Sequence, residues 1–479
     1  MGEVQQVLAG LRFNGSLRVE ARDERLTDGA GAVLIREVLE RSGVRRFLRG
    51  HLKDPRDPTK LTHPAAELIT TRTALVALGW RAQDDADRLR HDPALRLAVS
   101  DRAGDKPLRP VGEDELLPDG LASQPTLSRM TYWLGTSENL STLSDAVFEL
   151  AVARLLSANR GRRYKRLTVD VDGMPIEVEG HQSGAKYNGH YRATIFHPLI
   201  AVCGETGDML GALLRKGTAH AAEDFGEFVT GLVARLVGRV CESVLIRIDA
   251  GMVSEKTLAL LESKRIAYLA RVRNHAWFER EAKPFLKRPV GRRTNEPREF
   301  LHELELRPPA WSKARRMTLV VQERADDLYL HHFWLVTNLD PHARETAELL
   351  AAYRRRGCAE SHLGELSDVL APALSSAPRG VFSFQVEGVR PEDSADFRAN
   401  AVTFQLNLLA YNAMHALRCL TPLGVDDARM SLRTLRERVL RVAGRFLLHA
   451  RRVVVSISGV AGALWSAIGS RLRVLDAPA

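Results

Sequence analysis

Residues 167–272 carry the pattern that most restricts the fold of this 479-residue chain. The first part holds three short apolar segments, LTVDVDG, ATIFHPLIAVC and DMLGALLRKG, which are separated by turn residues and are typical of strands. The second part predicts a helix over 222–240, a strand over 244–249, a helix over 254–265 and a strand over 266–272. Three consecutive strands followed by alternating helices and strands predict a mixed α/β sheet.

The segments on either side differ in character from this block. Apolar residues at three- and four-residue steps predict helices before it, as in GAVLIREVLERSGVRRFL, and the C-terminal region is again mostly helical and rich in arginine. A polar, basic, proline-bearing stretch with two strand-like pieces, EFLHELEL and MTLVVQER, predicts a β-rich insertion. We therefore expect a helical N-terminal region, a core in two parts separated by the insertion, and a helical C-terminal region: 1–160, 161–273, 274–330, 331–396 and 397–479.

The net charge of +10 points to a polyanionic partner. Nucleic acid is the first expectation, because Lys and Arg contacts to phosphates supply most of the affinity that does not depend on sequence. Hydrophobic residues make up 45% of the chain, which is enough for a normal core and argues against disorder throughout.

Other parts of the chain favour a cytoplasmic location. The N-terminal segment carries charge early and lacks the apolar stretch of a secretory signal. The longest apolar run, VVVSISGVAGALW from Val453, is too short to span a membrane. The four cysteines lie far apart without the spacing of a zinc site, so we expect reduced core thiols at Cys203, Cys241, Cys358 and Cys419.

Three carboxylates stand out as a candidate site. Asp170 and Asp172 lie on one face of the first predicted strand, because side chains alternate along a strand, and Asp249 ends an otherwise apolar strand. Open α/β sheets place their ligand sites at the carboxyl ends of strands, where a helix packed on the sheet would add Glu360. Taken singly, each aspartate also fits a turn or cap, and Asp170 fits an ion pair with Arg166 or another base.

The stretch AAYRRRGCAESHLGELSDVL predicts a helix with three polar side chains on one face, Tyr353, Arg356 and Glu360, at i, i+3 and i+7. One interpretation is a surface ion pair between Arg356 and Glu360. The other is a catalytic face that completes a site with the strand aspartates. Carboxylates that hold two Mg²⁺ ions are suited to phosphoryl transfer, because the ions activate the attacking oxygen and stabilise the leaving oxygen.

The sequence resembles the DDE transposases of bacterial insertion sequences, in the IS4-like group and specifically the IS1380 family. DGAGAVLIREVLERSG, DPRDPTKLTH, DDADRLRHDPALRLAV and LASQPTLSRM are similar to the N-terminal segments of that family. LTVDVDGMPIEVEGHQSGAKYNGHY, RIDAGM and LVTNL resemble its core segments. FRANAVTFQLNLLAYNAMHALR and RVAGRFLLHARR extend the likeness to nearly the whole chain.

The resemblance implies an RNase H-like (retroviral integrase-like) catalytic core with a β-rich insertion between the second and third acids. The family's third acid lies in a Y-x₂-R-x₃-E-x₆-K signature, which here reads Tyr353, Arg356 and Glu360, with Ser367 where lysine is expected. The resemblance implies Asp172 as the first acid, because the D-G-M of residues 172–174 lies where related enzymes carry a D-x-T turn. Asp170 is the alternative.

The resemblance also implies a mechanism. Asp172, Asp249 and Glu360 are expected to bind Mg²⁺, with Mn²⁺ as a substitute, and to cut DNA at the terminal inverted repeats of an insertion sequence. The freed 3′-hydroxyl then attacks target DNA, and the protein acts as a homodimer on paired ends in the bacterial cytoplasm, at the nucleoid. The alternatives are a transposase-derived DNA-binding protein without catalysis and a nuclease without strand transfer.

Several basic residues are candidates for DNA contacts. The resemblance assigns Tyr353 and Arg356 to a phosphate near the cut bond. LASQPTLSRMTYWL is a candidate helix-turn-helix that presents Arg129, although an ordinary polar helix start explains it as well. Four basic clusters offer further phosphate contacts or, singly, solvated surface: 160–166 with Arg162, Arg163 and Lys165, 291–293, 313–316, and Arg451 with Arg452.

Overall fold

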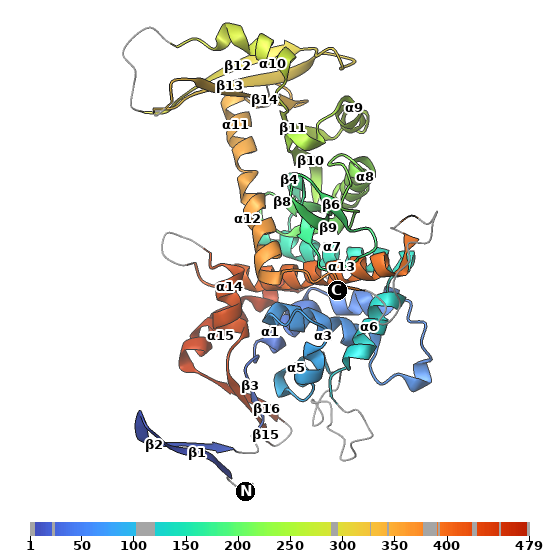
Figure 1. Cartoon of the computed structure of the whole chain (residues 1–479), viewed down its shortest axis with the longest axis vertical. Coiled ribbons are helices and arrows are strands. Elements are labelled where there is room, and N and C mark those ends of the chain that lie inside the picture. Colours follow the sequence, from blue (N-terminus) through green and yellow to red (C-terminus); the bar gives the residue numbers. More distant parts are fainter. Residues whose placement is uncertain are drawn as a thin grey trace. The chain divides into compact units, whose positions relative to one another are not determined.

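A computed structural model of the chain describes most of its residues (Figure 1). The described residues are 5–21, 24–101, 120–288, 296–325, 327–342, 344–376, 390, 393–423, 429–449 and 452–476. The basic cluster at 291–293 and Arg451 lie outside them. The chain divides into two compact units. Unit 1 comprises Met1–Arg41, Asp54–Met130 and Ala413–Arg473, and unit 2 comprises Ser42–Lys53, Thr131–Asn412 and Val474–Ala479.

Unit 2 is built on one mixed sheet, which confirms the predicted sheet type. The strand order is β12-β13-β14-β11-β10-β4-β8-β9. β4, β10 and β11 are parallel, and all other neighbours pair antiparallel. The strands are β4 (Tyr164–Gly173), β8 (Leu199–Cys203), β9 (Met209–Leu213), β10 (Cys241–Ile248), β11 (Ala267–Val272), β12 (Arg298–Leu306), β13 (Arg315–Glu323) and β14 (Leu330–Thr337).

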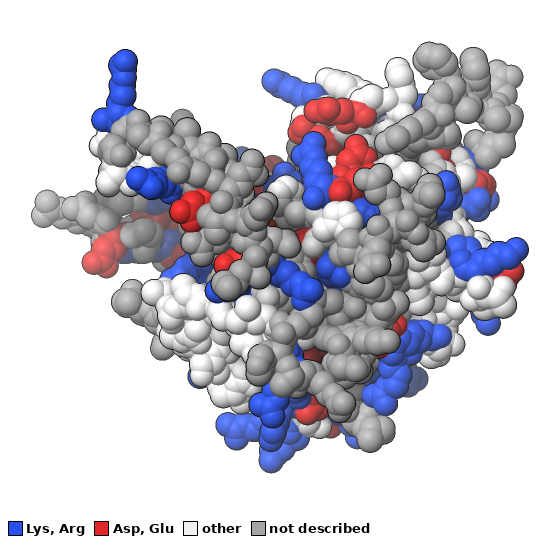
Figure 2. All heavy atoms as spheres, turned by 90° about the horizontal axis from the view of Figure 1, so that it is seen from below, with Lys and Arg blue, Asp and Glu red and all other residues white. Residues whose placement is uncertain are grey.

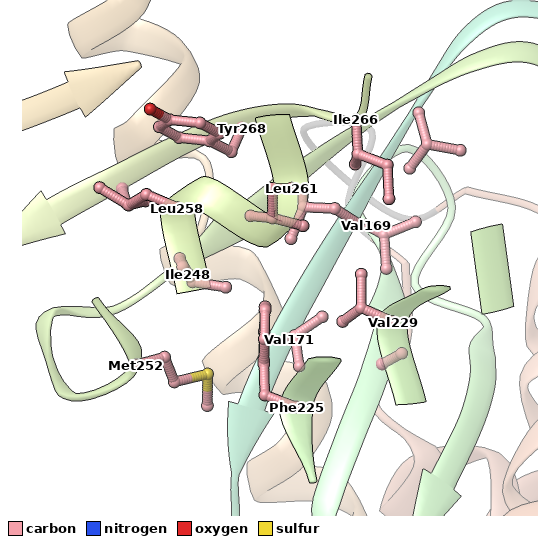
Figure 3. Packing of buried hydrophobic residues seen from close by; sticks show 14 of the residues in the cluster. Val169, Val171, Phe225, Val229, Ile248, Met252, Leu258, Leu261, Ile266 and Tyr268 are labelled. Carbon is pink, nitrogen blue, oxygen red and sulfur yellow. The ribbon is translucent and has the colours of Figure 1, made fainter. Parts of the chain in front are cut away.

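Alternation along β4 separates the two faces of this sheet. Val169 and Val171 point to one face, where they pack in a buried cluster with Phe225 and with residues of β10 and β11 (Figure 3). The helices that contribute to that cluster are α7 (Ser137–Ala158), α8 (Phe225–Leu236), α9 (Glu255–Ser263) and α10 (Ala276–Ala282). On the other face, Leu349 and Ala352 of α11 (Thr346–Arg354) pack against β10, β11, β13 and β14.

The helix predicted over 351–370 is interrupted. α11 ends at Arg354, α12 (Gly357–Glu365) follows, and a single π-helical turn (Leu366–Leu370) comes after it. Arg355 and Arg356 form the short junction between the two helices, and the backbone N–H of Arg356 bonds to the Tyr353 carbonyl at 2.9 Å. The junction still leaves Tyr353, Arg356 and Glu360 beside one another in space, because all three line the same pocket.

The β-rich insertion expected over 274–330 contributes strands to the same sheet as the core. Its two strand-like pieces form β12 and β13, as their alternating patterns suggest. β13 pairs with β14 along its whole length, and β14 pairs with β11 of the core. The insertion therefore widens the core sheet, and a small separate sheet is found elsewhere, in the order β5-β7-β6 (Ile176–Glu177, Ala193–Phe196 and Lys186–Asn188).

The free edge of β9 is covered by a helix of unit 2. α13 (Ala395–Leu420) belongs to unit 2 up to Asn412. The Asn412 side chain accepts a hydrogen bond from the Met209 N–H and donates one to the Met209 carbonyl, both at 2.9 Å. Gln405 donates to the Ala212 carbonyl at 2.9 Å. These amides satisfy edge groups that would otherwise be open to pairing with another strand.

Unit 1 is mainly helical but also contains strands. A short strand near the N-terminus pairs with a hairpin in the C-terminal region, which we expected to be mostly helical. RVVVSI is rich in β-branched residues, which favour a strand, whereas RFLLH has only the aromatic Phe446 as a strand-favouring residue. The elements are β1 (Gln5–Leu11), β2 (Asn14–Ala21), β3 (Leu26–Thr27), α1 (Ala32–Arg41), α3 (Ala65–Leu78), α4 (Asp85–Arg88), α5 (Pro93–Val99), α14 (Leu432–Leu435), β15 (Gly444–His449), β16 (Arg452–Ile457) and α15 (Gly459–Arg471).

Two further α-helices are α2 (Val44–His51), which packs on α7 in unit 2, and α6 (Gln124–Trp133). Of the helices in the described residues, none combines the length and apolar character needed to cross a membrane. The expectation that all four cysteines are core thiols is wrong for Cys358, which is exposed on α12, whereas Cys203 and Cys241 are buried.

Candidate active site

A pocket of about 560 Å³ brings the three predicted carboxylates together in unit 2. It lies where β4 and β10 end, against the junction of α11 and α12. The residues that line it are Asp172, Gly173, Tyr191, Asp249, Arg271, Gln322, Phe333, Tyr353, Arg354, Arg356, Gly357 and Glu360.

The parallel pairing of β4 with β10 places the two aspartates. Val171 pairs with Ile248, so the residues that follow them, Asp172 and Asp249, lie side by side at the carboxyl ends of the two strands. Asp249 follows the last residue of β10 and precedes a 3₁₀ turn at Ala250–Met252. The strands are therefore neighbours, as the convergence of the acids requires.

Arg356 lies between two of the acids. Its guanidinium contacts an Asp172 carboxylate oxygen at 2.5 Å and a Glu360 carboxylate oxygen at 2.9 Å. Arg356 is 8% exposed, whereas the Glu360 side chain is 64% exposed. The pair of Arg356 with Glu360 is thus more than a surface i,i+4 contact, because the same guanidinium also reaches β4 across the pocket.

Burial and neighbouring charge act on the site in opposite directions. Burial raises the pKa of Asp172, the positive charge of Arg356 lowers it, and the charges of Asp249 and Glu360 raise it further. The Tyr353 hydroxyl donates to Asp249 at 3.4 Å, and burial together with the Asp249 charge raises the pKa of Tyr353 to about 12. Tyr353 therefore remains a hydrogen-bond donor at neutral pH.

Asp170 has a different partner from Asp172, two positions along the strand. Both of its carboxylate oxygens accept from the Arg247 guanidinium at 2.6 Å, in a bidentate pair that is almost fully buried. The third donor of Arg247 bonds to the Ala352 carbonyl of α11. Asp170 is absent from the pocket lining, and its base is Arg247, not Arg166.

The fit of the acids to a divalent metal rests on their donor type and shared pocket. Carboxylate oxygens are the hard donors that Mg²⁺ prefers. In the arrangement of the described residues, no three His, Cys, Asp or Glu side chains are close enough to hold a metal ion. Arg356 supplies the positive charge between Asp172 and Glu360 in that arrangement, and it would have to withdraw before these two carboxylates could bind a cation.

Four of the predicted DNA-binding residues lie away from the pocket. Arg162, Arg163 and Lys165 are exposed around the start of β4, at the opposite end of the strand from Asp172. Arg129 is exposed on α6, in unit 1. Ser367, which stands where the signature has lysine, is exposed in the π-helical turn and does not line the pocket.

Figure 2 shows one face of the molecule, on which the described Lys and Arg side chains lie in small separate groups with Asp and Glu among them.

Sequence reasoning missed several residues of the pocket. Arg271 lies near the end of β11, and its guanidinium stacks 5.1 Å from the ring centre of Phe333 on β14. A charged residue inside the apolar segment IAYLARV was an available signal for Arg271. Tyr191 comes from a loop after β6 and carried no such signal, because only the fold brings that loop to Asp172.

The family model described as "Transposase DDE domain group 1" matches residues 10–377. The chain belongs to this DDE transposase family. The match includes both strand aspartates, Tyr353, Arg356 and Glu360. DDE transposases act on DNA, so membership supports a DNA-cutting enzyme, and transposase domains of this kind generally use divalent metal ions.

Two other comparisons concern the whole chain of this DDE transposase. It is similar to the cryo-EM structure of a piggyBac transposase synaptic complex with hairpin DNA. The two share 13% identity with a TM-score of 0.38, over 87% of this chain and 77% of the other. No curated protein matches the chain.

Proposed function

We propose that this DDE transposase cuts DNA at the terminal inverted repeats of an insertion sequence of the IS1380 family, in the IS4-like group. It then joins the 3′ ends to target DNA. The observation that carries the proposal is the single pocket shared by Asp172, Asp249 and Glu360. The order β9-β8-β4-β10-β11, three antiparallel strands followed by two parallel ones, supports an RNase H-like core.

In this proposal Asp172, Asp249 and Glu360 hold two Mg²⁺ ions, or Mn²⁺ in their place. Bound metal would lower the pKa of the attacking oxygen and stabilise the charge on the leaving oxygen. Asp172 is favoured over Asp170 as the first acid because both oxygens of Asp170 are occupied by Arg247.

The remaining side chains of the pocket position the DNA. Arg356 has a planar set of donors that matches a phosphate, and it becomes available to one when it leaves the two carboxylates. Tyr353 and Arg271 border the same space and offer a hydroxyl donor and a positive charge. The Phe333 ring lies against the guanidinium of Arg271.

The proposed chemistry has two steps at phosphorus. In the first, a water oxygen attacks the phosphodiester at the element's end, and the bond to the 3′-oxygen breaks to leave a 3′-hydroxyl. In the second, that 3′-hydroxyl attacks a target phosphodiester and displaces the target's own 3′-oxygen. Both are in-line displacements, so one set of carboxylates serves both.

The test uses purified full-length protein, labelled terminal-repeat DNA and Mg²⁺. Wild type should cut and join the DNA, and Glu360→Gln should bind it without cutting. Glu348→Gln is the matched control, because Glu348 is an exposed glutamate on α11 that does not line the pocket. Cutting by Glu360→Gln at the wild-type rate would refute the role of Glu360.

The same assay distinguishes the alternatives. Binding without cutting by wild type would favour a transposase-derived DNA-binding protein. Cutting without joining, in the presence of target DNA, would favour a nuclease that lacks strand transfer. Either result would contradict the proposed function.

A further inference from the structure

A second pocket, of about 410 Å³, lies on the same sheet face as the acids but toward the start of β4. Four arginines line it: Arg166, Arg247, Arg344 and Arg355. We call it the arginine pocket. None of these side chains lines the pocket that holds the acids.

The arginine pocket carries surplus positive charge. Of its four guanidiniums, only that of Arg247 is neutralised by a bidentate carboxylate, which is Asp170. One other carboxylate, Glu205, lines the pocket. Even with Glu205 ionised, two positive charges remain without a counter-charge.

Two of the four arginines flank α11: Arg344 precedes this helix and Arg355 follows it. Among the described residues, none forms a hydrogen bond or ion pair with the side chain of Arg344 or Arg355. Both oxygens of Glu205 accept from the Thr168 backbone N–H, at 2.9 and 3.0 Å, which fixes that carboxylate on β4. Arg166 is exposed and makes one long contact of 3.4 Å, to the Ser243 hydroxyl.

A glycine keeps the floor of the arginine pocket open. A Cβ added at Gly204 would lie 2.7 Å from a guanidinium nitrogen of Arg247 and 3.1 Å from Thr168. Any larger residue would displace the buried Arg247 or fill the space next to it. The pocket is therefore a positively charged cavity in which Arg247 is buried and paired with Asp170, while Arg166, Arg344 and Arg355 have no carboxylate partner among the described residues.

We propose that the arginine pocket binds backbone phosphates of the DNA whose scissile phosphate lies among the acids, a role that rests on the proposed function. Guanidiniums bind phosphate through paired N–H donors. A guanidinium that has no carboxylate partner gains the most binding energy from such a contact. Arg166 and Asp172 are six residues apart on β4, which is about 20 Å at about 3.3 Å per residue. Along a duplex this span corresponds to about six base pairs, at about 3.4 Å per step.

The first test measures how the binding of full-length protein to terminal-repeat DNA depends on salt. The double variant Arg344→Gln/Arg355→Gln should reduce the slope of log K against log[salt] by about 1.8, because each lost phosphate contact contributes about 0.9. The control is Lys256→Gln/Lys264→Gln, which removes the same charge from exposed positions on and just after α9, on the other sheet face. The control should keep the wild-type slope.

The second test locates the phosphates. Neutral methylphosphonates replace single phosphates along the terminal-repeat DNA. Wild type should lose affinity at one or two positions about six base pairs from the cut site, and the Arg344→Gln/Arg355→Gln variant should be insensitive at those positions. Circular dichroism melting confirms that the variants are folded.

The outcomes separate this inference from the proposed function. If wild type cuts terminal-repeat DNA but the arginine variant and the lysine control have equal slopes, the arginine pocket does not bind DNA and the proposed function stands. If the variant loses only the binding of free inorganic phosphate, with the DNA slope unchanged, the pocket is a site for small anions and the inference is wrong. If wild type binds DNA with the expected slopes and does not cut it, the phosphate site is supported and the proposed catalysis is refuted.

Discussion

At the scale of single residues, Asp170 and Asp172 have nearly the same sequence context but different surroundings. Both point to the α11 face of the sheet, and each contacts an arginine. Arg247 holds Asp170 through two short bonds in a buried pair, whereas Arg356 divides its donors between Asp172 and Glu360 at the edge of a pocket. The Asp170–Arg247 pair is therefore a buried structural contact, whereas Arg356 can exchange its carboxylate contacts for a ligand.

The variant Asp170→Ala should lower the free energy of unfolding by about 3–5 kcal/mol, because it leaves the Arg247 charge buried without its partner. Urea denaturation followed by circular dichroism measures the loss. The double variant Asp170→Ala/Arg247→Met should recover most of it, since both charges are then absent. The folded double variant also tests the first acid: DNA cutting by this variant would exclude Asp170, whereas loss of cutting together with an active Asp172→Asn would reverse our choice.

At the scale of elements, close backbone approach and buried ion pairs determine how helices are attached. α1 begins against the turn at Arg436–Leu440 in unit 1, where the Gly31 N–H bonds to the Leu440 carbonyl at 3.0 Å. A Cβ at Gly31 would lie 2.3 Å from the Leu440 Cα. Backbone cannot move aside as a flexible side chain does, so this contact admits only glycine.

Gly31→Ala should therefore destabilise the protein by about 1–3 kcal/mol or more, as overpacking does. Thermal melting measures the effect. Gly50→Ala is the matched control, because Gly50 lies in α2 and an added Cβ there meets nothing within 4 Å. The control should be neutral or more stable by about 0.5–1 kcal/mol, since alanine favours a helix over glycine. Equal melting temperatures for the two variants would contradict the close contact.

A second element-scale prediction concerns acid stability. Arg315 of β13 bonds to Glu255 at 2.6 Å and to Glu262 at 2.8 Å, and these contacts join β13 to α9. The hydrogen bond from Arg315 lowers the pKa of Glu255 to about 2, from an ordinary 4.5. Because the folded-state pKa is the lower one, this stabilisation is fully present above about pH 4.5 and is lost as the pH falls to about 2.

The measurement compares the free energy of unfolding between pH 5 and pH 2. It should fall less steeply for Glu255→Gln than for wild type, because the variant has no carboxylate to protonate. Glu227→Gln, an exposed glutamate in the first turn of α8, should follow the wild-type curve. A wild-type slope in both variants would show that the Arg315 pair does not contribute.

At the scale of the whole molecule, the net charge of +10 and the family membership both indicate DNA as the binding partner. We predict that two chains bind two terminal-repeat ends, because cutting and joining both ends of one element requires that they be held together. Sedimentation with labelled DNA should give a complex of two chains and two duplexes. A complex of one chain per duplex at all concentrations would contradict the prediction. Terminal DNA of scrambled sequence is the control.

Much of the fold could be predicted from the sequence, because strand and helix type depend on local patterns. Local patterns identified β4, β10 and β11, and the sequence separately identified Asp172, Asp249 and Glu360 as acids at the ends of strands or on a helix face. The strands of 444–457 were missed because short alternating segments next to helices are ambiguous in type. The break between α11 and α12 is likewise not marked by a proline.

The sequence by itself determined most of the element types, the basic character and the acids, since these depend on local residue order. The tertiary structure decided which acid is tied to which base, because the partners Asp170 and Arg247 are 77 residues apart and meet only through the pairing of β4 with β10. It also decided that the insertion extends the core sheet and that the arginines of β4 and β10 share one cavity with the two arginines that flank α11. These outcomes depend on long-range strand pairing and helix docking, which no local pattern encodes.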